Sequence, residues 1–93
     1  MGGNWIGMDV AEVNTLAQTF TNEANKIEQE IITMISTKLH GTTWQGQDRN
    51  QFESDWNSTL VHQLRTVATA LRDAATTANR NAAAQTSVSS TLT

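Results

Sequence analysis

The segment Gly41-Thr42-Thr43-Trp44-Gln45-Gly46-Gln47 separates two long stretches in which apolar residues recur at alternating steps of three and four. That period is typical of a helix that buries one stripe of its surface. The chain has no proline and no cysteine, and this segment is the break in the pattern, so a turn is predicted here. The first stripe consists of Val10, Val13, Ala17, Phe20, Ala24, Ile27, Ile31 and Met34, and the second of Phe52, Trp56, Leu60, Leu64, Val67, Leu71, Ala74 and Ala78.

The first helix is predicted over residues 9–40. The Asp9 carboxylate can accept hydrogen bonds from the free amides at the start, and Glu12 completes a pattern that resembles a capping box. Gly41 is suited to the left-handed conformation that ends many helices. At 1.5 Å per residue this helix would be about 45 Å long.

The second helix is predicted over residues 48–84, after a turn at 41–47. Thr43 is a candidate cap for its first amides. Residues 85–93 carry no charge and are mostly small or hydroxylated, so we predict a disordered tail. The whole chain, residues 1–93, is expected to form a single hairpin domain.

Folding back at Thr43 and Trp44 would align the two stripes in antiparallel register. Large residues would then mostly face small ones, as dense packing requires. The predicted pairs are Phe52 with Ile35, Trp56 with Ile31, Leu60 with Ile27, Leu64 with Ala24, Val67 with Phe20, Leu71 with Ala17, and Ala74 with Val13.

The apolar stripes are too wide for one neighbouring helix. Leu16, Ile32, Ile35 and Leu39 broaden the first stripe to roughly 160°, whereas a single partner covers a narrow seam. The expected fold is all-α: an antiparallel two-helix hairpin that dimerises into a four-helix bundle. The predicted core of the dimer and bundle comprises Val13, Phe20, Ile27, Ile31, Ile35, Phe52, Trp56, Leu60, Leu64 and Leu71.

Composition argues against several function classes. The net charge is −3 with six scattered Lys and Arg, whereas nucleic-acid binding needs a basic stripe. The N-terminus lacks the charge and the apolar run of a secretory signal peptide, and no segment is expected to span a membrane. Without cysteine, a chain of 93 residues has no disulfide to stabilise it, so a partner chain is expected.

No catalytic, cofactor or metal site is predicted. His40 and His62 are too far apart in sequence to ligate one metal from a single helix face. The serines lack a glycine-rich nucleophile turn, so we expect no enzyme. Trp44 is either an anchor at the bundle end, a surface that another protein recognises, or a turn residue. Gly46 is expected to permit a tight backbone or a close helix approach.

Glu28 and Glu53 lie at the edges of the apolar stripes. They can pair locally, as Arg49 and Glu53 can at a spacing of four, or they can face a partner chain and select it by charge.

Two helices around a central Trp-x-Gly, with Phe52 and Trp56 following at helical spacing, resemble the WXG family of ESAT-like proteins over roughly residues 9–78. The resemblance implies a helical hairpin that pairs as a homodimer, or as a heterodimer with a related WXG protein. It also implies export without an N-terminal signal, through the type VII secretion machinery of Gram-positive and mycobacterial-type bacteria. Carried over by position, the WxG motif is Trp44 and Gly46, in the surface that the export machinery handles.

One departure concerns export. The family's usual signal is a Tyr followed four residues later by an acid, just beyond the second helix, and this chain has no tyrosine. The chain would therefore leave the cell as the passenger of a partner that carries the signal.

Two further functions are compatible with the sequence. One is an intracellular helical adaptor or chaperone that pairs with another protein's helical domain. The other is a membrane-active helical protein, although polar faces rich in Thr, Asn and Gln suit anionic lipid poorly.

Overall fold

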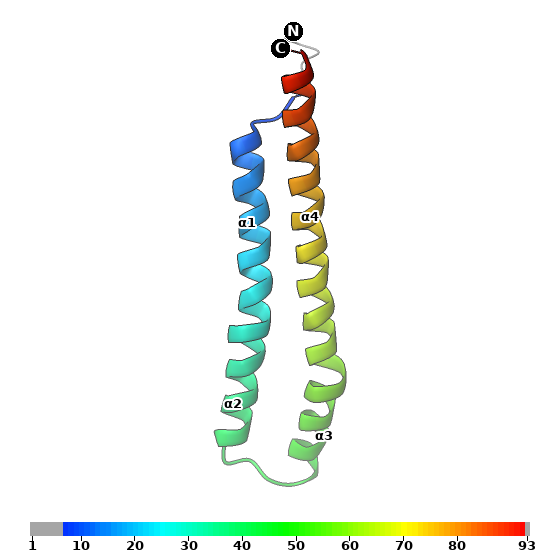
Figure 1. Ribbon diagram of the computed structural model, residues 1–93. Coiled ribbons are helices and arrows are strands. Elements are labelled where there is room, and N and C mark those ends of the chain that lie inside the picture. The colour runs from blue at the N-terminus through cyan, green and yellow to red at the C-terminus, as the bar shows by residue number, and fades with distance from the viewer. Residues whose placement is uncertain (1–6, 93) are drawn as a thin grey trace.

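The computed structural model describes residues 7–92, and it shows two long antiparallel helices joined by one turn (Figure 1). The chain is a rod with extents of 68 × 21 × 17 Å. The all-α hairpin predicted from the sequence is confirmed. The first helix consists of α1 (Val10–Lys26), the π-helical turn η1 (Ile27–Ile32) and α2 (Thr33–Gly41), and the second of α3 (Gln47–Asp55), the π-helical turn η2 (Trp56–Leu60) and α4 (Val61–Leu92).

Asp9 caps the start of α1 as predicted. Its carboxylate accepts a hydrogen bond of 3.1 Å from the backbone amide of Glu12, which would otherwise lack a partner within the helix. Asp9 itself has extended backbone angles, so helical geometry begins at Val10. The acidic Glu12 also lies in the first turn, where it complements the positive end of the helix.

The end of the first helix differs from the prediction. In the described part of the chain the left-handed region is occupied by Gly46, and Gly41 is instead the last helical residue of α2. The chain leaves the helix through extended Thr42, whose hydroxyl donates a 2.6 Å hydrogen bond to the Lys38 carbonyl oxygen. This side-chain bond satisfies a carbonyl that a left-handed glycine would have satisfied through the backbone.

The predicted disordered tail is also wrong within the described residues, because α4 continues through Leu92 and extends past the start of α1 (Figure 1). Ala82 is still buried between the helices, with 2% of its surface exposed. The neighbouring alanines favour helix, and each residue added to an existing helix gains one backbone hydrogen bond.

The buried residues fall into two groups of opposite size. Because residues 7–92 form two long helices and one turn, a side chain there is buried mainly between the two helices. Toward the chain ends we find an alanine seam, and toward the turn a turn-end core of large side chains. The alanine seam consists of Ala17, Ala24, Ala68, Ala75 and Ala82, and the turn-end core of Ile32, Leu39, Trp56 and Val61.

The ten predicted core residues are mostly not buried within the single hairpin. Trp56 alone among them is buried, while Ile31, Ile35, Phe52 and Leu60 are exposed. The other five, Val13, Phe20, Ile27, Leu64 and Leu71, are half-buried. Their role in a two-chain bundle stays a prediction.

The two π-helical turns explain where the predicted stripe departs from the buried one. From Ala24, a spacing of seven reaches Ile31, but η1 accommodates one extra residue and Ile32 is buried instead. In the second helix, a step of four from Trp56 reaches Leu60, but η2 shifts the buried position to Val61. A strictly regular helical period therefore predicts burial of Ile31 and Leu60, each one residue before the position that is buried.

The predicted register is wrong. Trp56 was expected beside Ile31, but its indole Nε1 donates a 2.9 Å hydrogen bond to the Ser36 hydroxyl. The contact is displaced by five residues, which exceeds one helical turn of 3.6 residues. In the alanine seam, small side chains of one helix therefore face small side chains of the other, and in the turn-end core large side chains face large ones. The predicted pairing of large with small side chains is not found.

Candidate interaction surface

The hairpin has one polar and one apolar face, and a cross-helix ion pair identifies them. Ile27 and Glu28 are both half-buried and flank the first helix's seam on opposite edges, as Leu71 and Arg72 do in the second. Arg72 donates hydrogen bonds to the Glu28 carboxylate and, at 3.0 Å, to the amide oxygen of Asn25. The two polar edges therefore share one side of the hairpin, and the Ile27 and Leu71 edges share the other.

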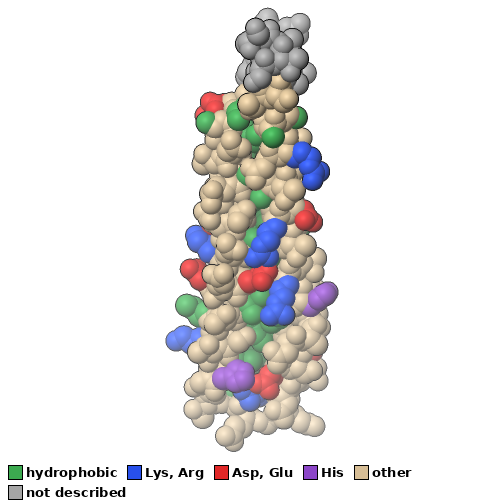
Figure 2. Space-filling view, viewed as in Figure 1, with side chains coloured by type: hydrophobic (Ala, Val, Ile, Leu, Met, Phe, Trp, Pro, Cys, Tyr) green, Lys and Arg blue, Asp and Glu red, His purple; other side chains and the backbone are tan. Residues whose placement is uncertain are grey.

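Figure 2 views the polar face. Charged side chains of both signs lie across the middle of the hairpin, and hydrophobic atoms show mainly as a narrow line between the helices. Side chains three, four or seven apart on a helix share an edge, which extends the Ile27 and Leu71 edges along both helices. The apolar face comprises Leu16, Phe20, Ile27, Ile31, Ile35, Leu60, Leu64, Val67 and Leu71.

The apolar face is exposed along both helices. Leu16 and Val67 each keep 49% of their surface exposed, and Ile31, Ile35 and Leu60 are close to 40%. The chain exposes 6814 Å² in all, against about 5300 Å² expected for a compact protein of its mass. The excess exceeds the roughly 800 Å² that each partner contributes to a typical protein interface. The rod therefore exposes enough surface beyond that of a compact protein to form an interface of typical size.

An aromatic pair lies at the turn. The rings of Trp44, in the connecting segment, and Phe52, on α3, have centroids 5.6 Å apart and are tilted by 45°. This tilted arrangement is favourable for aromatic rings. Each residue is 38% exposed, so the pair forms a surface feature.

Gly46 shapes the segment that carries Trp44. Its backbone angles are φ 116° and ψ −175°, a region essentially restricted to glycine. A Cβ atom built on Gly46 would meet no atom within 4 Å, so the close approach we considered is not what requires glycine. The backbone conformation requires it, and the Gly46 carbonyl oxygen then accepts a 3.1 Å hydrogen bond from the Asn50 amide.

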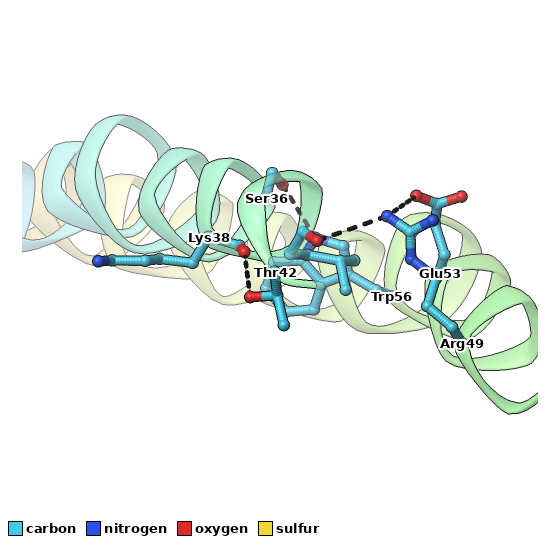
Figure 3. Close-up of polar contacts among 7 residues, drawn as sticks. Ser36, Lys38, Thr42, Arg49, Glu53 and Trp56 are labelled. Carbon is cyan, nitrogen blue, oxygen red and sulfur yellow. Dashed lines mark hydrogen bonds and ion pairs between the residues drawn. The ribbon is translucent and has the colours of Figure 1, made fainter. Parts of the chain in front are cut away.

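Two hydrogen bonds join the turn to the end of the first helix, and Figure 3 draws the Arg49 side chain that makes one of them. The Leu39 carbonyl oxygen accepts a bond of 3.3 Å from the Thr42 amide and one of 3.4 Å from Arg49 Nη2. Arg49 Nη2 also lies 3.2 Å from Glu53 Oε2, and both side chains are half-buried. Nearby, the Ser36 hydroxyl satisfies the indole N–H of buried Trp56.

The two glutamates singled out in the sequence both have partners within the chain. Glu53 pairs with Arg49 one turn earlier, and Glu28 pairs with Arg72 on the polar face, away from the apolar one. Sequence reasoning found the Arg49 spacing. It missed Ser36 and Arg72, because contacts between helices depend on a register that the pattern did not give correctly.

The remaining charges indicate no chemical site. A hydrogen bond and the nearby charge of Glu23 raise the pKa of Lys26, with a smaller effect of Glu30, but this pair is exposed. In the part of the chain that the structure describes, no cluster of three or more His, Cys, Asp or Glu could hold a metal ion. The apolar face and the aromatic pair are exposed apolar features that can bind another molecule.

The sequence matches no protein-family model, and neither the curated proteins nor the solved structures contain a significant match to it. Among the described helices, none combines the length and the hydrophobicity needed to cross a lipid bilayer.

Proposed function

We propose that this chain is a non-enzymatic, WXG-type exported protein, a substrate or dimer partner of a type VII secretion system. The main support for the proposal is that Gly46 and the Trp44–Phe52 pair occur together at the turn. Gly46 has a backbone conformation that favours glycine, and it holds Trp44 in an exposed pair with Phe52. The Trp-x-Gly spacing thus has a physical reason within a helical hairpin.

The apolar face supports the dimeric part of the proposal. It runs along both helices on one side, and the opposite side carries the Arg72–Glu28 ion pair. A second hairpin, from another copy or from a related WXG protein, would cover one face and complete a four-helix bundle. Because the other face is polar, this assembly closes at two chains.

Dimerisation can be measured with a matched pair of variants. Val67→Lys places a charge on the apolar face, and Ala70→Lys adds the same charge at an exposed position of the same helix. Ultracentrifugation should give a dimer for the wild type and for Ala70→Lys, and a monomer for Val67→Lys with its helical circular dichroism retained. A helical wild-type monomer at micromolar concentration would refute the dimer.

Export is tested separately, in a bacterium with a type VII system. The chain lacks the usual tyrosine signal, so we expect it in the culture medium only when a Tyr-bearing partner is co-expressed. Trp44→Ala should abolish export and leave the helical content unchanged. Export that persists after inactivation of the system's membrane ATPase would overturn the secretion assignment.

The second candidate is an intracellular adaptor that pairs with another protein's helical domain. The same apolar face favours it, since an amphipathic helix from any protein could lie there. A stable complex with a helical partner, together with absence of the chain from the medium under all conditions, would support this candidate over the first.

A further inference from the structure

The side chain of Arg49 closes the chain segment that contains Trp44 into a loop. Arg49, in the first turns of α3, reaches back to the Leu39 carbonyl oxygen in α2. Residues 39–49 thereby form a closed loop with Trp44 near its middle. Because the Leu39 side chain is only 7% exposed and belongs to the turn-end core, the loop is attached to a rigid point.

The same guanidinium also pairs with a residue of α3, the helix that carries the other ring of the pair. Glu53 holds it at 3.2 Å, and Phe52, adjacent to Glu53 in sequence, contacts Trp44. Without Arg49, the connecting segment would keep its bonds at each end, from Thr42 to Leu39 and from Asn50 to Gly46. The nearest remaining polar link between the two helices would be the Trp56–Ser36 hydrogen bond, which lies inside the core and does not reach the Trp44 segment.

An ordinary surface ion pair is the competing explanation for Arg49. Exposed ion pairs contribute little to stability and do not restrain other parts of the chain. Here the Arg49 side chain is 21% exposed, its Nε atom is buried, and it bonds a backbone carbonyl ten residues away. These features indicate a structural connection between two helix ends.

We propose that Arg49 is a positioning residue for the Trp44–Phe52 surface: it fixes the separation of the two helix ends and so holds the rings together at the turn. What this surface recognises rests on the proposed function. The positioning itself rests only on the contacts of Arg49.

The experiment uses the full-length chain with two-dimensional NMR. Arg49→Met keeps the aliphatic stem and removes the hydrogen bond to Leu39 and the ion pair with Glu53. We expect it to lose the Overhauser contacts between the Trp44 and Phe52 rings and to increase the mobility of the Trp44 indole N–H. The Trp56 indole signal, which reports the core, should stay in place. Glu53→Gln, which leaves the bond to Leu39 possible, and Arg65→Ala, at an exposed position on α4, should both retain the ring contacts.

Each outcome decides the question. Ring contacts that persist in Arg49→Met would overturn the proposal, and so would their loss together with the Trp56 signal and the helicity, since Arg49 would then act through overall stability. Arg49→Lys, which restores a donor and a charge, should recover the ring contacts at least in part, and failure to do so would also count against it. If the wild-type chain is not exported, the proposed function fails while this comparison still stands.

Discussion

The alanine seam and the turn-end core hold the same two helices together in different ways. In the seam, small side chains let the backbones approach closely, and each buried methyl contributes little apolar area. In the turn-end core, four large side chains fill a wider space, and burying each one fully is worth about 1.5–3 kcal/mol. The comparison teaches that the seam is sensitive to added volume and the core to lost volume.

The largest effect should follow from removing volume in the turn-end core. Trp56→Ala would leave a cavity beside Leu39 and Ile32 and should lower the free energy of unfolding by about 3–5 kcal/mol in urea denaturation. Trp44→Ala is the matched control, because it removes the same side chain from an exposed position. Equal losses for the two variants would mean that the turn-end core does not stabilise the hairpin.

Adding volume to the seam should be the next most damaging change. Ala68 has no exposed surface, so Ala68→Leu should cost about 1–3 kcal/mol by forcing the helices apart. Ala70→Leu, two residues later and exposed, should change stability little. If Ala68→Leu stabilised the chain, the close approach of the helices in the seam would be refuted.

The two glycines that flank the turn provide the third comparison. Gly46→Ala imposes the conformation φ 116° on an alanine and should cost about 1–3 kcal/mol. Gly41→Ala lies within α2 without positive φ and should be neutral or stabilising by up to about 1 kcal/mol. Urea denaturation of both variants measures the difference, and the opposite ranking would contradict the assigned backbone conformations.

The smallest effect is expected from deleting the extra residue of a π-helical turn. Removing exposed Gln29 should convert η1 to α-helix and leave Ile32 and Leu39 in the buried stripe, so the melting temperature should change little. Deleting exposed Asn22, where α1 has no extra residue, should instead turn Leu16 toward the position of Ala17 and destabilise the seam. A greater loss for the Gln29 deletion would show that η1 is required rather than accommodated.

The helices, their start and the turn depend on local patterns, which can be read from the amino-acid sequence. A stripe at helical period predicts a helix wherever it occurs, Asp9 followed by Glu12 predicts a start, and a break at Trp44-Gln45-Gly46 predicts a turn, because each depends on neighbours within a few residues. The same reasoning selected Trp44, Gly46 and the Arg49–Glu53 spacing.

The side of each stripe that is buried depends instead on the contact between the two helices. The one-residue shifts at η1 and η2 exchange Ile31 for Ile32 and Leu60 for Val61, and both members of each pair are apolar. No local rule distinguishes them. The choice depends on which residues of the other helix lie opposite, where alanines permit a close approach and Trp56 reaches Ser36. That choice also leaves the larger side chains on the apolar face, because packing of the seam, and not hydrophobicity alone, selects what is buried.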